Sequence, residues 1–510
     1  MSNQNRTIYG GKVNREKPIN FVFNGKSYIG YQGDTLASAL LANDVHLIGR
    51  SFKYHRARGI LTAGSEEPNA IVQLGLGART EPNIRATEVE LYEGLEASSQ
   101  NCWPSVNFDI GAMNNFLSRI FPAGFYYKTF KWPPSMWLFY EHFIRKAAGL
   151  GQSPTAKNPD RYEQKFYYTD ITIVGGGISG LLAALGAGRS GCKVLLIDEN
   201  PELGGYLLDY NFSINEKDGK KWLKKIIDEL NGLANVVILK RTTAMGYYDY
   251  NYLTALEKVT NHHVEFSSTL PRERYWRIRS KKVILAQGAF ERPLVFADND
   301  RPGIMMASAG QKYLSRYGVL PGKSVVLFTN NDHAYLTAFE FVEKGAKVTV
   351  VDTRDLLNAR ISEKCKSLNI TVFKSYSVIK TYGDKKVNRI EIQQVDKNQN
   401  QLTGEVENIH TDCVLMSGGW NPAVQLFSQS RGKLKYDLKI NTFVPDKIIE
   451  NQKIIGSNNG QFNLQENLNE SFEAGIAAAN ELNFNSVEKV NWTGKEEIEF
   501  THSDLSLIHI

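Results

Sequence analysis

Three glycines stand at positions that suit the binding of a dinucleotide phosphate. Gly175, Gly177 and Gly180 form a GxGxxG pattern directly after the β-branched run ITIV and at the start of a predicted helix. In this pattern the first glycine permits a tight turn, the second lets the backbone approach a pyrophosphate, and the third allows close packing of helix on strand. The N–H groups and dipole of the helix N-terminus favour the phosphates. We therefore predict a cofactor-binding loop that also includes Gly176 and Ser179.

A pair of acidic residues follows at the end of the next predicted strand. Asp198 lies 23 positions after Gly175, where an acid can bind the ribose hydroxyls, and Glu199 is the alternative acceptor. No arginine follows nearby to receive a 2′-phosphate, so the sequence favours NAD or an adenosine-type ligand over NADP. Gly205 and Gly288 complete the predicted cofactor-binding positions in this core.

A second strand, turn, helix and acid-ended strand occurs later in the chain. Residues 325–353 repeat the pattern of residues 171–199, and Asp352 again lies 23 positions after the turn at Thr329. We predict two Rossmann-like modules, one inserted within the other or following it. Other side chains replace the expected glycines of the second module, namely Thr329, Asn330, Asn331 and Ala334. Because a side chain at the close-approach position obstructs a pyrophosphate, a retained scaffold is favoured over a second dinucleotide site.

Three further segments resemble parts of flavoproteins with two dinucleotide domains. Residues 284–293 (ILAQGAFERP) resemble the strand and turn that cross back beneath the nucleotide, and residues 415–422 (LMSGGWNP) resemble the second crossing. Residues 455–460 (IGSNNG) occupy the place of a motif that usually ends in Gly-Asp and binds the ribityl chain of FAD. Ser457 or Asn458 replaces that aspartate, which weakens the case for FAD on this chain.

The amino-terminal region predicts a β-grasp domain of the ferredoxin-like or ubiquitin-like kind. Two β-rich runs flank Asn24-Gly25, a strong hairpin signal, and Thr35 caps the predicted helix that follows. In a plant-type ferredoxin, the loop of residues 50–64 would supply cluster cysteines. It contains no cysteine here, so an iron–sulfur cluster cannot form.

The same loop is rich in basic side chains, namely Arg50, Lys53, His55, Arg56 and Arg58. One interpretation is a clamp for a flavin or nucleotide phosphate through charge-assisted hydrogen bonds, with Arg58 as a cofactor-binding residue. The other interpretation is a solvent-facing loop.

Composition excludes several classes of protein. The chain has 510 residues, enough for about three domains. With 42% apolar and 22% charged residues its composition is that of a globular protein. A net charge of +6 without a block of five basic residues argues against a nucleic-acid partner. Four cysteines scattered through the chain exclude a disulfide scaffold, a CxxC redox pair, a thioredoxin-reductase-like active site and a four-cysteine metal site.

The sequence also bears on location. We expect a cytoplasmic protein, because the cysteine usage fits a reducing compartment and the polar N-terminus contains no secretory signal. Residues 171–188 carry no charge over a membrane-spanning length, but six of them are glycine. This run therefore predicts a strand, a tight turn and a helix, and we expect no membrane association.

Residues 101–150 contain 13 aromatic residues. At this density they must be covered, either by packing between domains or by another subunit. We place a ferredoxin-like domain at 1–100, an aromatic-rich connector at 101–168 and a double Rossmann core at 169–430. Residues 431–510 would complete that core and begin a connecting segment.

Five segments together resemble the α subunits of heterotetrameric sarcosine oxidases, over about residues 8 to 485. They are GGKVNREKPINFVFNGKSYIGYQGDTLASALLAND, SFKYHRARGILTAGSEEPNA, RPGIMMASAGQKYL, FTNNDHAYLTAFE and SGGWNPAVQLFSQSRGKLKYD. The resemblance implies an α/β fold, in which a ferredoxin-like β-grasp domain that has lost its cluster precedes a core of the pyridine nucleotide-disulfide oxidoreductase type. It implies that the core holds NAD at the Gly175–Gly180 loop and at Asp198.

The resemblance also implies partners and a reaction. FAD and the amine site would lie on a β subunit, FMN would be shared near the α–β boundary, and small accessory subunits would complete the complex. Sarcosine, water and oxygen would give glycine, formaldehyde and hydrogen peroxide, with electrons passing from FAD through FMN to oxygen. The family's α subunit continues into a folate-binding half that this sequence lacks, and residues 505–510 look unrelated to it. We therefore expect a truncated gene model.

Two alternatives remain open from the sequence. One is the α subunit of an opine or amino-acid oxidase or dehydrogenase, which naturally lacks the folate half. The other is a non-catalytic scaffold that binds a nucleotide and positions a catalytic partner. We predict no catalytic residue and no metal ligand on this chain, and the adjacent pair His262-His263 is interpreted as solvated.

Overall fold

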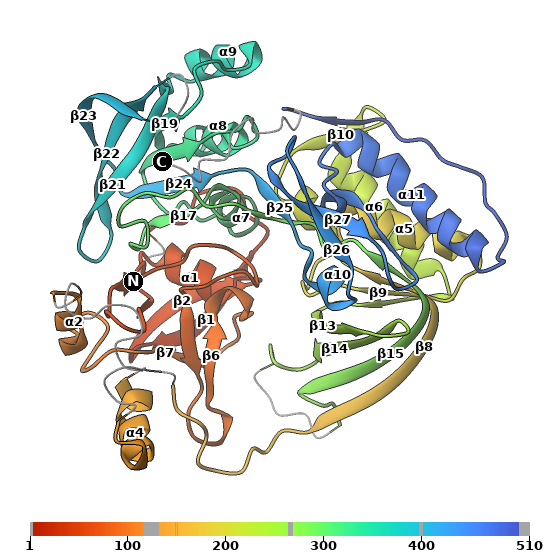
Figure 1. Cartoon of the computed structure of the whole chain (residues 1–510), viewed down its shortest axis with the longest axis horizontal. Helices are drawn as coiled ribbons and strands as arrows, with labels where there is room; N and C mark the ends of the chain where they lie inside the picture. The colour runs from red at the N-terminus through yellow and green to blue at the C-terminus, as the bar shows by residue number, and fades with distance from the viewer. Residues whose placement is uncertain are drawn as a thin grey trace.

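A computed structural model describes residues 4–116, 118, 132–147, 149, 151–263, 269–396 and 401–498. Three larger sheets organise it, and the colours of Figure 1 follow the chain from the amino-terminal domain in red to the last helix in blue. Residues 505–510, whose sequence suggested a truncated gene model, lie outside the described residues. Among the described residues no helix is both long and apolar enough to cross a bilayer.

The amino-terminal sheet has the strand order β2-β1-β7-β5-β6. Its strands are β1 (Asn14–Phe23), β2 (Lys26–Gln32), β5 (Ile71–Leu74), β6 (Glu81–Arg85) and β7 (Leu95–Ser99). Asn24 and Gly25 turn β1 into β2 with φ of 51° and 74°. Helix α1 (Leu36–Ala42) begins at the predicted cap, because Thr35 Oγ1 accepts a hydrogen bond from Ser38 N at 3.1 Å. A short ribbon, β3 (Gly49–Arg50) and β4 (Ala57–Arg58), spans the basic loop.

The first Rossmann-like module is built on a seven-stranded sheet. Its parallel strands are β12 (Val236–Leu239), β9 (Val194–Ile197), β8 (Tyr162–Val174), β15 (Glu273–Leu285) and β28 (Gln452–Ile454). Antiparallel strands β14 (Tyr252–Lys258) and β13 (Thr242–Tyr248) continue from β15. The helices of this module are α5 (Ile178–Arg189), α6 (Gly219–Gly232) and α11 (Leu464–Glu481). Helices α5 and α11 touch where each has a glycine, since a Cβ on Gly475 would lie 2.1 Å from Ala183 O.

The second module is inserted within the first. Strand β16 (Ala289–Glu291) leads into it and β25 (Trp420–Pro422) leads out, and the two strands pair antiparallel. Its parallel sheet is formed, in order, by β17 (Ile304–Met306), β24 (Cys413–Ser417), β18 (Ser324–Thr329), β19 (Lys347–Asp352) and β20 (Thr371–Lys374). Its helices are α7 (Ala307–Tyr317), α8 (Tyr335–Glu343) and α9 (Ala359–Ser367), and its antiparallel sheet is β21 (Tyr376–Gly383), β22 (Val387–Val395) and β23 (Leu402–His410). Of the two predicted arrangements, the insertion is the one observed.

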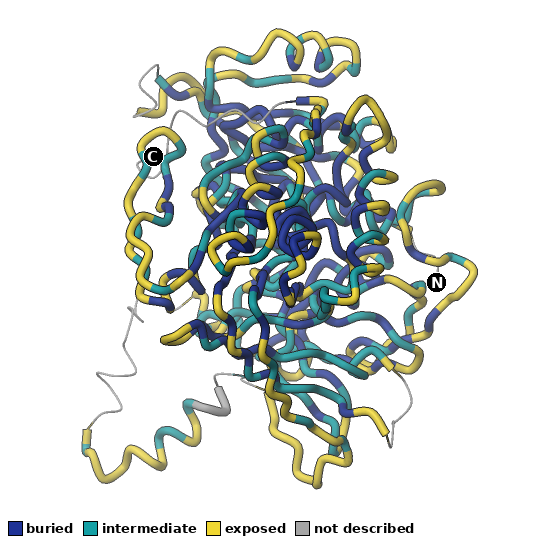
Figure 2. The backbone as a smooth tube through the Cα atoms, turned by 90° about the vertical axis from the view of Figure 1, so that its right-hand side faces the viewer, coloured by how far each residue is buried: buried dark blue, intermediate teal, exposed yellow. Residues whose placement is uncertain are grey.

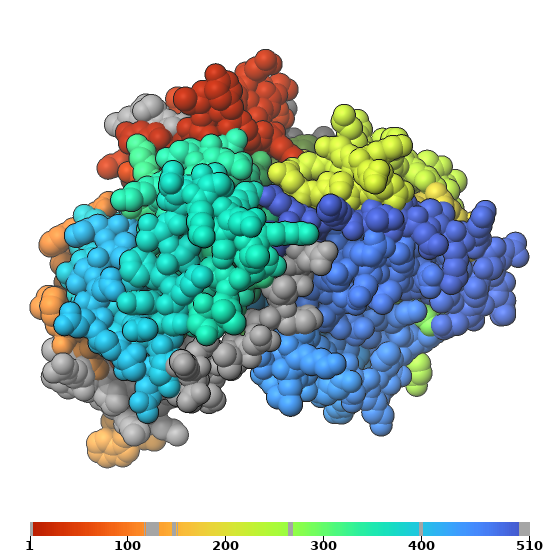
Figure 3. All heavy atoms as spheres, turned by 90° about the horizontal axis from the view of Figure 1, so that it is seen from above, coloured from red at the N-terminus to blue at the C-terminus, as the bar shows by residue number. Residues whose placement is uncertain are grey.

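Short elements close the first module. Helix α10 (Gln425–Gln429) and the hairpin of β26 (Lys433–Asp437) and β27 (Thr442–Lys447) precede β28. A small sheet joins β11 (Lys217–Asp218), β10 (Phe212–Ile214) and β29 (Gly494–Glu496). Seen from above, the carboxy-terminal segment in dark blue reaches the second module, where Lys364 and Glu497 form an ion pair (Figure 3).

The buried core is divided unequally. One apolar cluster runs without interruption through the amino-terminal domain and the second module, whereas the first module has separate clusters of its own. Figure 2 shows this interior as dark blue tube surrounded by yellow and teal surface segments. The predicted α/β fold class is confirmed, and the uncharged run 171–188 forms the end of β8, a turn and α5.

The aromatic connector contains several exposed aromatic side chains. Helices α2 (Met113–Phe116) and α4 (Trp137–Ala147) stand at the margin of the molecule in Figure 1. Leu138 is 81% exposed, and Phe139 and Phe143 are more than half exposed. The connector is packed against the amino-terminal domain at Val106, which is 5% exposed and whose carbonyl accepts a hydrogen bond from Arg50 Nη2 at 2.7 Å, whereas α4 is largely exposed. Residues 119–131 lie outside the described residues.

Candidate functional site

A cavity of about 320 Å³ opens at the carboxyl ends of the parallel strands β8, β9 and β15 in the first module. This edge of a doubly wound sheet is where such folds bind ligands. Its wall contains most of the predicted cofactor residues, namely Gly175, Gly177, Ser179, Asp198, Glu199, Gly205 and Gly288. Gly176 and Gly180 lie in the same loop behind this wall, and Arg58 does not line the cavity.

The glycine loop has the geometry that its sequence predicts. Gly175 has φ of 106°, and a Cβ there would lie 2.2 Å from Ala286 O, so the turn requires glycine. A Cβ on Gly180 would lie 1.8 Å from Gly175 O, so the start of α5 can lie against the loop only without a side chain. A Cβ on Gly177 would meet no atom within 4 Å, because this residue faces the cavity. A ligand can therefore approach the backbone at Gly177.

The two acids at the end of β9 use their carboxylates differently. Asp198 Oδ2 accepts a hydrogen bond from Gly176 N at 2.5 Å, and its Oδ1 accepts one from Asn200 N at 2.7 Å. Asp198 thus fastens the glycine loop to the end of β9. Glu199 Oε1 instead accepts a hydrogen bond from Ser65 Oγ at 2.9 Å, and the Glu199 side chain is accessible from the cavity. Desolvation raises the pKa of Glu199, and the carboxylates of Asp198, Glu88 and Glu66 raise it further, against the Ser65 hydrogen bond.

Other polar atoms in the wall are available to a ligand. Gln287 Oε1 and Asn467 Oδ1 are buried, line the cavity and have no hydrogen-bond partner among the described residues. Gly205 approaches Gly177 closely, since a Cβ on it would lie 3.1 Å from Gly177 Cα. Gly288, with φ of 78°, has no atom near the position of a Cβ. Because buried acceptors normally have a donor, a dinucleotide with its hydroxyl and amide donors fits this cavity.

The position expected to bind a ribityl chain carries no carboxylate. Ser457 lines the cavity, whereas Asn458 is fully buried and its Nδ2 donates to Ala423 O at 2.7 Å. Of the two residues that could replace the flavoprotein aspartate, Ser457 is the one that faces a ligand.

Aromatic side chains form the wall of the cavity where the two modules meet. Tyr206, Phe290 and Trp420 line it, and the Tyr206 hydroxyl is hydrogen-bonded to His333 Nε2 of the second module. Burial lowers the pKa of His333 to about 3, so this imidazole is neutral at pH 7. Next to Phe290, burial raises the pKa of Glu291 to about 7, although its Oε2 accepts a hydrogen bond from Ser308 N at 2.8 Å.

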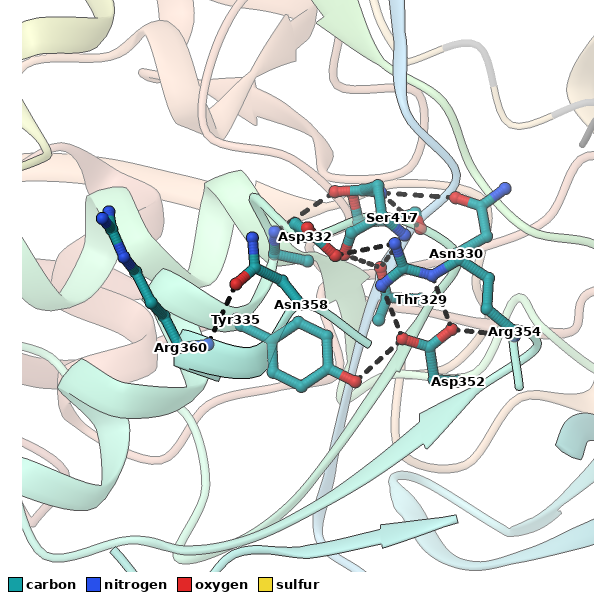
Figure 4. A network of polar contacts seen from close by, with 11 residues as sticks. Thr329, Asn330, Asp332, Tyr335, Asp352, Arg354, Asn358, Arg360 and Ser417 are labelled. Carbon is teal, nitrogen blue, oxygen red and sulfur yellow. Dashed lines mark hydrogen bonds and ion pairs between the residues drawn. The ribbon is translucent and has the colours of Figure 1, made fainter. Parts of the chain in front are cut away.

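The corresponding place in the second module is filled by the chain itself (Figure 4). Asp352 Oδ2 accepts hydrogen bonds from Tyr335 Oη and Arg354 Nη2, each at 2.8 Å. Arg354 Nη1 also donates to Asp332 Oδ1 at 2.7 Å. Asn331 Nδ2 donates to Ser417 Oγ at 3.0 Å, and residues 329–333 are all less than 5% exposed. Because the acid is already paired and side chains occupy the loop, the scaffold interpretation of this module is favoured.

The basic loop of the amino-terminal domain is tied into the protein. Arg58 and Arg56 both pair with Asp300, and Arg56 Nε lies 2.7 Å from Asp300 Oδ2. His55 Nδ1 lies 2.7 Å from Asp109 Oδ2. Arg58 therefore pairs with Asp300, a residue 242 positions later in the sequence. It does not line the cavity that contains most of the other predicted cofactor residues.

Four residues of the site come from parts of the chain that local patterns did not connect with it. They are Ser65 of the amino-terminal domain, Tyr206 after β9, Trp420 of the return crossing and Glu496 of β29. Tyr206 directly follows the predicted Gly205, and Trp420 lies within residues 415–422, which resemble the second crossing of a flavoprotein. Both residues could therefore have been predicted from their neighbours in sequence. No sequence signal joins Ser65 or Glu496 to the glycine loop.

Comparisons with known proteins agree with this architecture. The family model described as a 2Fe-2S iron-sulfur cluster binding domain matches residues 16–102, and the pyridine nucleotide-disulphide oxidoreductase model matches residues 169–447. In the crystal structure of L-proline dehydrogenase from P. horikoshii, 77% of the chain aligns with 95% of this one, with a TM-score of 0.61 and 18% identity, which is a likeness of fold.

Curated relatives are more similar in sequence. The sarcosine oxidase alpha subunit of Rhizobium meliloti (strain 1021) is 46% identical over 448 residues, which are 88% of this chain and 44% of that protein. The corresponding alpha subunit of Corynebacterium sp. (strain U-96) is 33% identical over 88% of this chain and 42% of that protein. An opine oxidase subunit of Agrobacterium tumefaciens (strain Ach5) is 29% identical over 36% of this chain and 37% of that protein. The predicted resemblance is confirmed, and the chain spans less than half the length of its sarcosine oxidase relatives.

The residues do not fit an iron–sulfur cluster, although the amino-terminal family model describes one. Within residues 16–102 the sequence has a single cysteine, Cys102, whereas such clusters need four ligands. In the part of the chain that the structure describes, no group of three or more His, Cys, Asp or Glu side chains could hold a metal ion. This domain therefore keeps the fold without the ligands of the cluster.

Proposed function

Because the chain belongs to the pyridine nucleotide-disulphide oxidoreductase family and is similar to sarcosine oxidase α subunits, we propose that it is the nucleotide-binding part of such an α subunit. The observation that carries the proposal is the cavity of the first module, with its glycine loop, paired acids and unpartnered acceptors, inside a region of 46% identity to a sarcosine oxidase α subunit.

The residues of this cavity favour NAD. Gly177 and the N-terminus of α5 would hold the pyrophosphate, because backbone N–H groups and the helix dipole there stabilise a negative charge. Glu199 accepts hydrogen bonds from the adenosine ribose, while Asp198 holds the loop in place. Ser457 offers a hydroxyl where FAD would need a carboxylate. When bound, NAD supplies a nicotinamide ring that can accept or donate a hydride.

In this proposal, oxidation of the amine requires the whole complex and does not take place on this chain alone. A β subunit carries FAD and the amine site, FMN is shared at the boundary with this chain, and small accessory subunits complete the assembly. The complex oxidises sarcosine with water and oxygen to glycine, formaldehyde and hydrogen peroxide. This chain contributes no catalytic residue; it contributes the nucleotide and a surface for its partners, for which the exposed aromatic helix α4 is the strongest candidate.

The test is to purify the chain alone and together with a sarcosine oxidase β subunit. Denaturing each preparation and separating the released small molecules by chromatography should give NAD from both and FAD only from the complex, while FMN should stay covalently attached to the β subunit. Hydrogen peroxide production from sarcosine should require the complex. Turnover of sarcosine by the lone chain, or release of FAD from it, would contradict the proposed division of labour.

One alternative has an observation in its favour. The opine oxidase subunit from Agrobacterium tumefaciens is 29% identical over 193 residues, so an opine or amino-acid oxidase is the second candidate. Assaying the complex with sarcosine and with opines separates the two candidates. If the complex oxidises neither substrate and yet retains NAD, the chain is a nucleotide-binding scaffold.

A further inference from the structure

The wall of the cavity beside Glu199 is supplied by another domain. Ser65 lies in the loop of the amino-terminal domain, 134 positions before Glu199, and its hydroxyl donates to Glu199 Oε1 at 2.9 Å. We propose that Ser65 is a positioning residue that holds Glu199 as the ribose acceptor, and that this contact between domains makes the site select a nucleotide with a free ribose 2′-hydroxyl over a 2′-phosphorylated one. The inference rests on the nucleotide site proposed above.

A single buried carboxylate organises the loop that carries Ser65. Glu67 is 1% exposed, and its Oε2 accepts hydrogen bonds from Leu61 N at 2.9 Å and Thr62 N at 2.6 Å. Its Oε1 accepts hydrogen bonds from Asn69 N at 2.7 Å and Ala70 N at 2.9 Å. Four backbone N–H groups are therefore satisfied by one side chain, which fixes the path of the chain on both sides of Ser65.

The second module holds the same loop from outside. Tyr313 Oη donates to Thr62 O at 2.9 Å, and Lys312 Nζ donates to Ala63 O at 2.7 Å, both from helix α7. Met306 N donates to Leu61 O at 2.8 Å. Ser65 is thus placed by contacts that do not depend on a ligand. A hydroxyl held in this way fixes the orientation of the carboxylate that it bonds, as outer residues do for the ligands of a metal.

Charge around Glu199 opposes an additional phosphate. Glu66 and Glu88 of the amino-terminal domain and Asp198 of the first module all act electrostatically on Glu199. An adjoining cavity contains basic side chains, but its arginines are paired, Arg241 with Glu90 and Arg316 with Asp209. Lys312, which interacts electrostatically with Glu66 and Glu199, offsets part of the negative charge and donates a hydrogen bond to Ala63 O. A 2′-phosphate would add negative charge to a region of four carboxylates, whereas an uncharged 2′-hydroxyl can donate to Glu199.

The experiment measures the affinity of the full chain for NAD and for NADP by calorimetry, after bound nucleotide has been removed, with the partner subunits present where the complex forms. In Ser65→Ala we expect NAD to bind about tenfold more weakly, the effect of losing one hydrogen bond to a charged group. NADP has no free 2′-hydroxyl to donate to Glu199, so its affinity should fall less. The preference for NAD over NADP should therefore decrease. Ser65→Thr keeps the hydroxyl and should restore the preference. Ser27→Ala, at an exposed position of β2, is the matched control.

A second variant tests the charges independently of Ser65. The double change Glu66→Gln and Glu88→Gln should strengthen NADP binding more than NAD binding, and an unchanged ratio of the two affinities would contradict the proposed role of these charges. If the unaltered protein binds NAD but Ser65→Ala keeps its full preference for NAD, the inference is wrong and the proposed function stands. Failure of the unaltered protein to bind NAD would overturn both.

Discussion

At Gly175 the first module turns from β8 into α5 through a loop without side chains, whereas the second module turns from β18 into α8 through Thr329, Asn330 and Asn331. Both turns lie at the carboxyl end of a parallel strand and are followed by an acid at the end of the next strand. Beside the first turn there is a cavity of about 320 Å³. Around the second, the acid is bonded to a tyrosine and an arginine of the same module.

The two modules share a topology, but within the described residues only the first leaves space for a ligand beside its turn. The Rossmann-like topology needs the strands and helices, but the nucleotide needs space, and in the first module glycine provides that space at Gly177. In the second module, the polar edge of the sheet is satisfied internally, which gives a stable wall for the amino-terminal domain with which it shares a core. Substitutions should therefore have different consequences in the two modules.

The largest effect is expected for Gly180→Ala in the first module. Its Cβ would lie 1.8 Å from Gly175 O, so the loop or α5 must shift. We expect a loss of at least about 3 kcal/mol in the free energy of unfolding, together with loss of bound nucleotide. Denaturant unfolding and nucleotide release measure the two effects. Gly232→Ala, where a Cβ meets no atom within 4 Å, is the control; equal stability of the two variants would contradict the prediction.

Arg354→Met in the second module should affect stability alone. It leaves Asp352 and Asp332, both nearly buried, without their cation, which we expect to cost about 2 to 3 kcal/mol of unfolding free energy. Nucleotide content should stay that of the unaltered protein. Arg360→Met, at an exposed position near the same network, is the control. Loss of nucleotide from Arg354→Met would show that the second module takes part in binding.

Gly177→Val in the first module should weaken nucleotide binding without lowering stability. A Cβ at this position would meet no protein atom within 4 Å and the residue lines the cavity, so thermal stability of the nucleotide-free protein should change little. Nucleotide affinity should fall by about thirtyfold, equivalent to about 2 kcal/mol, because the backbone becomes inaccessible to the pyrophosphate. Gly177→Ala should cause a smaller loss. If Gly177→Val retains nucleotide, the nucleotide does not bind at the glycine loop of the first module.

The smallest effect is expected for Glu291, which lies on β16 where the chain passes from the first module into the second, and it concerns the pH dependence of stability. Burial raises the pKa of Glu291 to about 7 from its ordinary 4.5, so the folded protein binds this proton more tightly than the unfolded chain. Stability from this group is complete below pH 4.5 and is lost as the pH rises through 7. Glu291→Gln should be more stable than its parent at pH 8 and similar to it near pH 4.5, because only the parent must keep a buried carboxylate ionised at the higher pH. Parallel stability curves for the two proteins would contradict this assignment.

The sequence predicted the parts of the site that depend on neighbours along the chain. The spacing of Gly175, Gly177 and Gly180 and the acid after the next strand are local features, and Gly175, Gly177 and Asp198 line the cavity. The division of work between Asp198 and Glu199 was not predictable, because it depends on Ser65 from another domain. The partner of Arg58 was missed for the same reason, since a cluster of positive charge in sequence says nothing about an acid 242 residues away.

The insertion of the second module has a consequence for the order in which the protein folds. Strand β15 leaves the ribosome long before β28, its parallel neighbour in the first sheet, and α11, which packs on α5, emerges later still. The inserted module, together with the amino-terminal domain whose core it shares, is complete in the emerging chain before this closure can occur. Its folding brings the ends of a long connection together at β16 and β25, which reduces the entropy lost when the sheet closes. The pairing of β16 with β25 thus brings the two parts of the first module's sheet close together.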